Sequence, residues 1–259
     1  MTTKMPKFPT GSFIRNCDRY EIISTLGRGK YSEVYEGIDN ISGKRVVIKI
    51  LKPVRKVKIS REITILQTLR SGTNIVDLLD VCLDRVTNTP SLIFEYISSS
   101  NLKTILNQLS LEDIQHYTFQ ILKAIDYCHS RGIMHRDIKP MNIIVDVNNK
   151  SLKLIDWGLS EFYIPNKDFN TRVSSRPYKS PELLIGYHYY DFSMDIWSTG
   201  CILAAMMFKR DHFFLGKDNN DQLLKIVQIL GSNDFFNYLQ KFNITVDASE
   251  MTLYKKYCK

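Results

Sequence analysis

The 259-residue sequence is poor in features that would staple it or hold a structural metal. Its cysteines lie far apart, with no CxxC pair and no Cys/His cluster at metal-ligand spacing: Cys17, Cys82, Cys128, Cys201 and Cys258. Internal repeats and low-complexity tracts are also missing. The cysteine pattern indicates reduced thiols in an intracellular protein.

Membrane-directing features are missing as well. The N-terminal stretch MTTKMPKFPT has no apolar signal-peptide core and lacks the glycine that myristoylation requires. The longest apolar run, CILAAMMF at 201–208, is far too short to span a bilayer. We therefore expect no export and no contact with a membrane.

The composition is that of an ordinary globular protein with an excess of positive charge. Hydrophobic residues make up 44% and charged residues 24%, which excludes long disorder and a collagen-like chain. The length allows one large domain or two lobes with a packed core. A net charge of +8 is compatible with nucleic acid, an anionic surface or acidic protein as a partner.

Much of this charge is concentrated in the stretch KPVRKVKISRE at 52–62. Ile59, Ile63 and Leu66 have the spacing of an amphipathic helix, so the basic residues crowd a helix N-terminus, where the helix dipole favours acidic residues instead. A solvated charged face is one interpretation, and binding of an acidic partner is the other. The basic residues are Lys52, Arg55, Lys56, Lys58 and Arg61.

The pattern along the chain changes from strands to helices. Between residues 20 and 96 the sequence consists mostly of short strand-like runs, interrupted by one helix. This pattern predicts a small antiparallel β lobe. Beyond 97 the pattern is mainly helical, notably at 110–132, where Ser110 is a candidate N-cap and Asp113 follows three residues later. We expect an α+β fold in two lobes with a ligand cleft between them, and an N-terminal segment at 1–19. The β-rich lobe spans 20–96 and the mainly α lobe spans 97–259.

Two features of the β lobe indicate phosphate binding. In LGRGKYSEV at 26–34, Gly27 and Gly29 would let the backbone approach a ligand closely, although Ser32 stands where a third glycine is usual and a plain hairpin has the same signature. Lys49 lies in an apolar strand, so its ammonium either reaches the surface or is paired. Glu62 on the following helix is the obvious partner.

The large lobe carries the more specific motif. IMHRDIKPMNIIV at 133–145 brings Asp137, Lys139 and Asn142 to one loop, which supplies a base, a cation and a metal ligand and so suits phosphoryl transfer. LKLIDWGL at 152–159 then ends a strand with Asp156, which is placed to bind Mg²⁺.

Taken in order, the glycine loop, strand Lys, helix Glu, HRD loop, DWG and PE box resemble the eukaryotic protein kinases from about Tyr20 onward. GRGKYSEVYE, DYCHSRGIMHRDIKP, LIDWGLSEFY and RVSSRPYKSPELL are similar to the catalytic alpha subunits of casein kinase II. In that family a Ser takes the third loop position and Trp follows the metal-binding Asp, as Ser32 and Trp157 do here. The resemblance implies the bilobal kinase fold, with a C-terminal end shorter than the family's.

The resemblance also implies a mechanism. ATP, with GTP as an alternative donor, would lie in the cleft, and Lys49 held by Glu62 would bind its α- and β-phosphates. Asn142 and Asp156 would hold Mg²⁺, Asp137 would deprotonate the acceptor hydroxyl and Lys139 would offset charge on the γ-phosphoryl group. The nucleotide-binding positions implied are Leu26, Gly27, Gly29, Ser32, Val34, Val47, Lys49, Phe94, Glu95, Ile97, Ile144 and Ile155.

The same resemblance gives the substrate and partner expectations. Lys139 matches serine/threonine kinases, and the family prefers acidic sequences around the acceptor, which would explain the basic cluster. A dimeric regulatory subunit would dock on the β lobe over a surface that includes Ile22, Tyr35 and Cys82, and the family works in cytoplasm and nucleus. The substrate-binding positions implied are Lys52, Arg55, Lys56, Lys58, Arg172, Arg176 and Lys179.

Two alternatives and two local expectations remain. A kinase-shaped binding module without activity would be expected to lose Lys49, Asp137 or Asp156, and all three are present. A nucleic-acid site is disfavoured because no aromatic residues interleave the basic cluster.

The indole N–H of Trp157 is expected to donate a hydrogen bond to a backbone carbonyl. Glu182, whose usual Arg partner has no counterpart here, is expected to be unpaired and to reach water. The alternative is that Lys255 or Lys256 folds back to replace that Arg.

Overall fold

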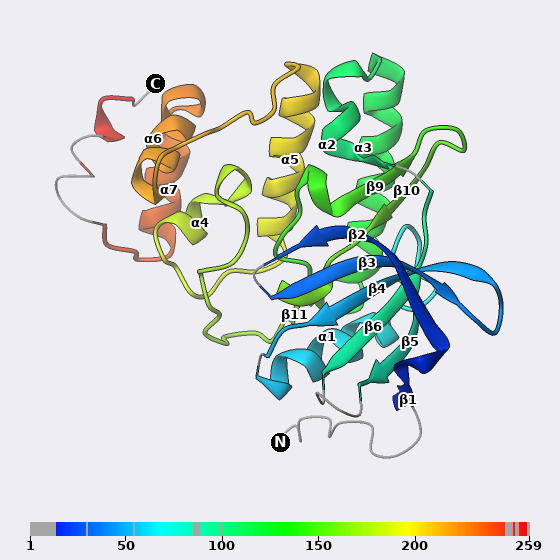
Figure 1. The fold of residues 1–259 in the computed structure, drawn as a ribbon. Coiled ribbons are helices and arrows are strands. Elements are labelled where there is room, and N and C mark those ends of the chain that lie inside the picture. Colours follow the sequence, from blue (N-terminus) through cyan, green and yellow to red (C-terminus); the bar gives the residue numbers. More distant parts are fainter. Residues whose placement is uncertain are drawn as a thin grey trace.

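Two lobes make up the computed structural model (Figure 1). It describes residues 14–29, 31–53, 55–84, 89–98, 100–246, 251 and 254–257, with residues 14–16 described through their backbone. Cys258, Lys30 and most of the expected N-terminal segment therefore lie outside the described residues. Within the described ranges, no helix is long and apolar enough to cross a membrane.

The first lobe is built on a six-stranded sheet in the order β1-β5-β6-β4-β3-β2. All neighbours are antiparallel except β1, which pairs with β5 in parallel and comes from within the expected N-terminal segment. The predicted antiparallel β lobe is confirmed. Its strands are β1 (Ile14–Asn16), β2 (Tyr20–Arg28), β3 (Ser32–Asp39), β4 (Lys44–Leu51), β5 (Leu78–Leu83) and β6 (Pro90–Glu95).

Alternation along β4 assigns its side chains to two faces of the sheet. Val46 and Ile48 pack on the outer face with Cys82 and Ile93, while Leu51 joins the inner cluster with helix α1 (Lys56–Thr68). Lys49 lies two residues before Leu51 on β4, so its side chain is on the same face of the sheet and is directed toward α1. The expected amphipathic helix is α1, and it buries Ile59, Ile63 and Leu66, as its spacing predicted.

The second lobe is mainly helical, as expected, and α3 packs beside α5 (Figure 1). The helices are α2 (Leu102–Ile105), α3 (Leu111–His129), α4 (Pro181–Leu184), α5 (Ser193–Met207), α6 (Asn219–Leu230) and α7 (Asn233–Lys241). The strands are β7 (Ser100–Asn101), β8 (Ile133–Met134), β9 (Ile143–Asp146), β10 (Ser151–Leu154) and β11 (Glu161–Phe162). The 3-10 turns of this lobe are η2 (Leu106–Gln108), η3 (Pro140–Asn142), η4 (Trp157–Leu159) and η5 (Arg176–Tyr178), and η1 (Cys17–Arg19) lies between β1 and β2 of the first lobe.

One apolar core joins the lobes. It runs from Ile63 on α1, through Phe94 on β6 and Ile125 on α3, to Ile202 on α5. A backbone hydrogen bond also links the lobes there, because the Val76 amide donates to the Leu154 carbonyl at 3.2 Å. The β lobe is thus attached to the helical lobe where β9 begins and β10 ends.

The N-terminus of α3 has the predicted capping arrangement. The Ser110 hydroxyl accepts from the Asp113 amide at 3.1 Å, and the Asp113 carboxylate accepts from the Ser110 amide at 3.2 Å. Gly132, three residues beyond the helix, has φ +71°, a conformation that glycine adopts without strain.

We expect Ser110→Ala to lower the free energy of unfolding by about 1 kcal/mol, because one helix N–H loses its acceptor. Ser130→Ala at the other end of α3 is the matched control, since its hydroxyl donates to the Tyr127 carbonyl and caps no amide. Urea unfolding of both variants measures the difference. An equal loss for both would contradict the capping role.

Candidate active site

An ion triad forms where the lobes meet, with Lys49 and Glu62 buried and the Asp156 side chain 47% exposed. Lys49 Nζ on β4 lies 2.8 Å from Glu62 Oε1 on α1 and 2.8 Å from Asp156 Oδ1 after β10. The predicted Lys49–Glu62 contact is therefore present, and the alternative of a lysine reaching the surface is wrong, because its side chain is only 12% exposed. Burial acts to lower the pKa of Lys49, but the two carboxylates outweigh it and hold that pKa above its usual value. The lysine stays charged.

The same triad keeps Asp156 ionised. Burial acts to raise the pKa of Asp156, yet the ammonium of Lys49 outweighs this and leaves that pKa below its ordinary value. Asp156 has a left-handed backbone with φ +62°, which is uncommon for a residue with a side chain. The unusual conformation turns this carboxylate toward the strand lysine and starts η4.

Asp137 lies in the loop between β8 and β9 and is 5% exposed. Its carboxylate accepts from Lys139 Nζ at 2.7 Å and from Asn142 Nδ2 at 3.1 Å. On the other side it accepts from both the amide and the hydroxyl of Ser175, each at 3.0 Å. The structure therefore brings together the three residues predicted from this loop and adds Ser175, whose position 38 residues later gave no local signal.

Asp195 on α5 fixes the shape of this loop and was missed as a functional residue. It is fully buried and accepts from the amides of His135 at 2.8 Å and Arg136 at 2.9 Å, while His129 Nε2 lies 2.9 Å away. Arg136 has φ +68°, so its strained backbone is held by this carboxylate. The available signal was an acidic residue inside an apolar helix, which must find partners when buried.

Trp157 and His135 connect the Asp137 loop to the Asp156 segment. Trp157 is buried and its indole N–H donates to the Leu154 carbonyl at 3.3 Å, which confirms the expected bond. Its ring meets that of His135 edge-on at 4.6 Å, and His135 Nε2 lies 3.1 Å from the Ile155 carbonyl. Burial lowers the pKa of His135, so the ring is neutral and serves the packing of this segment.

Glu161 on β11 ties α1 to the large lobe and was also missed. Its carboxylate pairs with Arg61 of α1, and it lies 4.0 Å from Arg136 and 3.8 Å from Lys167. Because Glu62 is on the same helix as Arg61, this pair helps keep Glu62 within reach of Lys49.

The predicted nucleotide-binding residues come from the strands that surround the triad. Val34 is opposite Lys49 across β3 and β4, and Val47 is opposite Phe94 across β4 and β6. Ile144 lies on β9, opposite Lys153 of β10. Phe94 is 8% exposed, whereas Leu26 on β2 is 50% exposed. Glu95 is the last residue of β6, and Ile97 follows two residues later.

Gly27 and Gly29 lie at the end of β2 with ordinary backbone conformations. A Cβ on Gly27 would meet no atom within 4 Å, and one on Gly29 would only touch the Ser32 carbonyl at 3.4 Å. The described residues therefore do not crowd these positions, and the predicted close approach of a ligand to the backbone stays a prediction.

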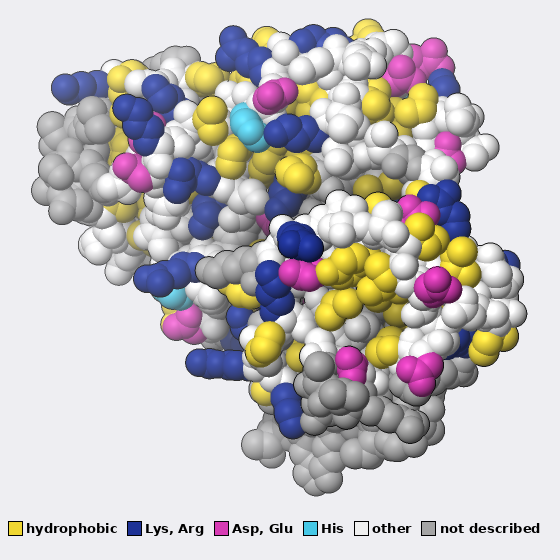
Figure 2. All heavy atoms as spheres, in the orientation of Figure 1, with side chains coloured by type: hydrophobic (Ala, Val, Ile, Leu, Met, Phe, Trp, Pro, Cys, Tyr) yellow, Lys and Arg dark blue, Asp and Glu magenta, His cyan; other side chains and the backbone are white. Residues whose placement is uncertain are grey.

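The predicted substrate-binding residues differ in whether they already bond to other parts of the chain. Arg55, Lys56 and Lys58 are exposed around the start of α1, which has no acidic residue in its first turn. Lys52 instead donates to the Gly29 carbonyl at 3.0 Å. Lys and Arg side chains are grouped on the face shown in Figure 2, where the β2–β3 hairpin and the start of α1 approach the large lobe.

The remaining predicted basic residues lie in the segment between β11 and α4. Arg172 is exposed, and Arg176 is exposed while it donates to the Lys217 carbonyl at 2.6 Å. Lys179 is half-buried and donates to the Thr171 carbonyl at 3.2 Å. Burial lowers the pKa of Lys179, and nearby Arg176 adds to this effect. Lys179 is thus less available to an external acid than Arg172.

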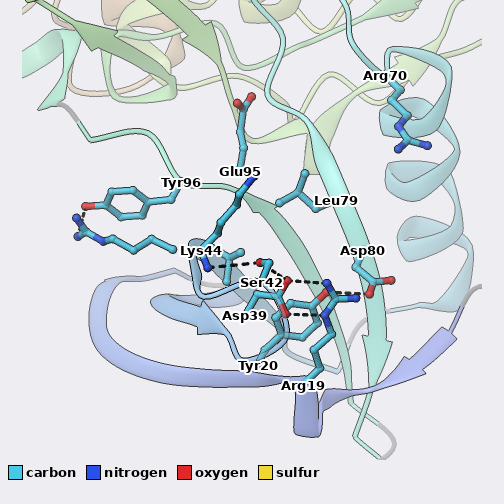
Figure 3. A pocket seen from close by; sticks show the side chains of 12 residues that line it. Arg19, Tyr20, Asp39, Ser42, Lys44, Arg70, Leu79, Asp80, Glu95 and Tyr96 are labelled. Atoms are coloured by element: carbon cyan, nitrogen blue, oxygen red, sulfur yellow. Dashed lines mark hydrogen bonds and ion pairs between the residues drawn. The ribbon is translucent and has the colours of Figure 1, made fainter.

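A separate cavity of about 710 Å³ lies on the β lobe (Figure 3). Arg19, Tyr20, Asp39, Asp80 and Glu95 line it, and of these only Glu95 is a predicted site residue. Glu95 pairs with Lys153 at 2.8 Å, and its amide donates to the Asp77 carbonyl at 3.1 Å. This cavity is therefore distinct from the cluster formed by Lys49, Asp137 and Asp156.

The expectation that Glu182 reaches water is wrong. Glu182 on α4 does not reach water: it is 9% exposed, and burial raises the pKa of its carboxyl. Among the described residues it forms no ion pair, and Lys255 and Lys256 are both exposed, so neither replaces the expected arginine. The carboxylate is buried because Pro181–Leu184 packs into the large lobe beside α6.

The site can bind a cation and a strongly anionic ligand side by side. Asp156 and the side-chain carbonyl of Asn142 offer hard oxygen donors, which suit Mg²⁺. No cluster of three or more His, Cys, Asp or Glu suited to a metal is found within the described chain. The donor set fits a cation that completes its shell with water and ligand phosphates, as Mg²⁺ commonly does.

Comparison with known families agrees with this geometry. A family model described as the protein kinase domain matches residues 20–254, which is most of the chain. The match includes both lobes and every predicted site residue.

Glu182 provides a pH-dependent prediction. Because burial raises its pKa in the folded state, the folded protein binds this proton more tightly than the unfolded chain. Stability from this group is present at low pH and is lost as pH rises from the unfolded value of about 4.3 through the folded one. We expect Glu182→Gln to be more stable than wild type at pH 7 and to lose less stability between pH 4 and 7.

Urea unfolding at several pH values measures this effect. Glu112→Gln on the exposed face of α3 is the control, because its side chain is 84% exposed. If Glu182→Gln were less stable than wild type at pH 7, the carboxylate would have a stabilising partner and the argument would fail.

Proposed function

The chain belongs to the protein kinase family, and from that premise we propose that it is a serine/threonine kinase of the casein kinase II alpha type. In this proposal it transfers the γ-phosphate of ATP to Ser or Thr in acidic sequences. The observation that carries the proposal is the pairing of two clusters: Lys49 with Glu62 and Asp156, beside Asp137 with Lys139 and Asn142.

The strand lysine is the proposed phosphate-binding group. Glu62 and Asp156 hold its ammonium at 2.8 Å each, so the charge is positioned before any ligand arrives. Such preorganised charge stabilises a phosphoryl-transfer transition state more than a mobile surface lysine does. Among the described residues, no atom lies within 4 Å of a Cβ built on Gly27, which leaves room there for close approach of phosphates.

The adenine is proposed to lie among the apolar side chains of the cleft. Leu26 on β2 is half exposed, and burial of such a side chain by a flat apolar ring is favourable. Because the Glu95 amide bonds to the Asp77 carbonyl, the base is proposed to contact the Glu95 carbonyl and the Ile97 backbone instead. Asn142 and Asp156 are proposed to hold Mg²⁺, which would neutralise charge on the phosphates.

Asp137 is the proposed base for the acceptor hydroxyl. Its neighbours fix it from several sides: Lys139 at 2.7 Å, Asn142 at 3.1 Å and Ser175 at 3.0 Å. Lys139 is close enough to offset negative charge on the transferred group, and its position after Asp137 favours a serine/threonine acceptor. Positioning and electrostatics would supply most of the rate, since the protein forms no covalent intermediate.

The acidophilic preference is proposed from the exposed cations near the site. Arg55, Lys56, Lys58 and Arg172 remain available to acidic residues near the acceptor, whereas Lys52 and Lys179 are partly engaged within the chain. The basic start of α1 would also be relieved of its unfavourable interaction with the helix dipole when an acidic substrate binds.

Two family properties remain as parts of the proposal. We propose that the enzyme is active without phosphorylation of its activation segment. The bond from Trp157 to the Leu154 carbonyl and the Arg61–Glu161 pair support this, because both hold the site in place. A regulatory-subunit dimer is proposed to dock on the β lobe, where Ile22 is 49% exposed. Cys82 must be removed from that surface, because it is 1% exposed and packs inside the outer-face cluster.

The direct test is transfer of radiolabelled phosphate from ATP to a peptide with Ser followed by Asp and Glu. Transfer to this peptide, with little transfer to a matched peptide carrying Asn and Gln, would support the proposal. Nucleotide binding without transfer to either peptide would support the alternative of a kinase-shaped binding module.

We expect Asp137→Asn to reduce phosphotransfer by at least about 1,000-fold while nucleotide affinity changes little, since the base is lost and the triad remains. Asp126→Asn is the control, because Asp126 is exposed on α3. Turnover and nucleotide affinity are measured on the same samples. Substantial remaining turnover in Asp137→Asn would contradict the assignment of this residue.

We expect the double change Lys56→Gln and Lys58→Gln to raise KM for the acidic peptide by about 3- to 10-fold and to flatten its salt dependence, with KM for ATP unchanged. The control replaces two exposed lysines of the large lobe, Lys103 and Lys225. Equal effects on acidic and neutral peptides would mean that the start of α1 serves folding instead.

A further inference from the structure

The first described residues are held against the outer face of the β sheet. β1 pairs in parallel with β5, with Arg15 opposite Cys82, and η1 follows directly. The Arg19 guanidinium then donates two bonds to Asp39, each 2.6 Å long, and the Tyr20 hydroxyl donates to Asp80 at 2.8 Å (Figure 3). These contacts place Cys17 over the sheet.

This placement brings two thiols together. The sulfur atoms of Cys17 and Cys82 are 2.8 Å apart, although the residues are 65 positions apart in the chain. Both are free cysteines; Cys17 is half-buried and Cys82 is buried beside Val46, Ile48 and Ile93. A disulfide would require the sulfurs to move only about 0.8 Å closer.

The other described cysteines lack this arrangement. Cys128 is buried on α3 and its thiol donates to the Ile125 carbonyl at 3.2 Å. Cys201 is buried on α5, and within the described ranges no other sulfur lies in bonding contact with either residue. The close pair is thus a specific feature of η1 and β5.

We propose that Cys17 and Cys82 are a site of reversible oxidation, at which a peroxide joins the two thiols in a disulfide. The Cys17 sulfur attacks one peroxide oxygen, the O–O bond breaks, and Cys17 becomes a sulfenic acid as one water leaves. The Cys82 sulfur then attacks the Cys17 sulfur, the S–O bond breaks and a second water leaves. In total the two thiols lose two electrons and two protons, and hydrogen peroxide is reduced to two waters.

Exposure decides which thiol reacts first. Cys17 is partly open to solvent, whereas Cys82 is enclosed and its burial raises the pKa of its thiol, which disfavours the reactive thiolate. Once Cys17 is a sulfenic acid, Cys82 is the thiol already in contact with it. The disulfide therefore forms faster than further oxidation of Cys17.

The crosslink would fasten the N-terminal segment to the middle of the β lobe. It would close a loop of 65 residues, and a loop of this size restricts the unfolded chain strongly. The disulfide would lie among the side chains of the outer-face cluster. Lys49 is on the opposite face of the sheet, which packs on α1. We therefore expect greater resistance to heat without a change in the arrangement around Lys49.

The test uses the full chain, reduced and then freed of reductant. Samples are treated with hydrogen peroxide, alkylated, digested and examined by mass spectrometry without reduction. We expect a peptide pair joined through Cys17 and Cys82, two hydrogen atoms lighter than the free peptides, and a rise in unfolding temperature on the order of 5–10 °C that dithiothreitol reverses.

Cys17→Ser and Cys201→Ala are the paired variants. Cys17→Ser should lose the linked peptide and the temperature rise, while Cys201→Ala, which removes a buried thiol outside the pair, should keep both. The proposal is overturned if Cys17 is instead oxidised to a sulfinic acid or pairs with a different cysteine. It is also overturned if the temperature rise persists in Cys17→Ser.

Discussion

The ion triad of Lys49, Glu62 and Asp156 is the interaction on which the site depends. It joins three elements from both lobes: β4, α1 and the segment after β10. A lysine buried without partners would be costly, so the position of α1 and the left-handed turn at Asp156 are both required by the charge on one strand residue. The strand alternation that buries Leu51 against α1 also directs Lys49 toward that helix.

A buried carboxylate, Asp195, fixes the shape of the loop that carries Asp137. Asp195 accepts two successive amides, from His135 and Arg136, and so holds a strained turn beside Asp137. Strain of this kind persists only where the surroundings fix it, and the surroundings here are a rigid helix in the core of the large lobe. The Asp137 loop is thus shaped by a residue almost 60 positions away, as the bond from the Arg136 amide to Asp195 shows.

The two lobes contribute differently to the proposed function. The β lobe supplies a fixed cation, an apolar wall and a basic edge at the start of α1, while the large lobe supplies carboxylates and an amide. The pair between Arg61 and Glu161 connects them, since it restrains the helix that carries Glu62. A movement of α1 would therefore change the position of the basic substrate-binding residues and of the Lys49 ammonium. It would also change how both lie relative to the proposed base.

The sequence by itself determined the order of strands and helices, the cap of α3, the Lys49–Glu62 contact and the residues of the Asp137 loop, because these follow from local periodicity and short motifs. Long-range packing decided the rest. Asp195, Ser175 and Glu161 reach the site from distant segments, and no local pattern encodes such contacts. Burial likewise could not be read from sequence at Glu182 or Cys82, since a residue's exposure is set by which elements pack over it. The sequence thus specified the reactive groups, and the tertiary structure decided which of them are held, enclosed or left free.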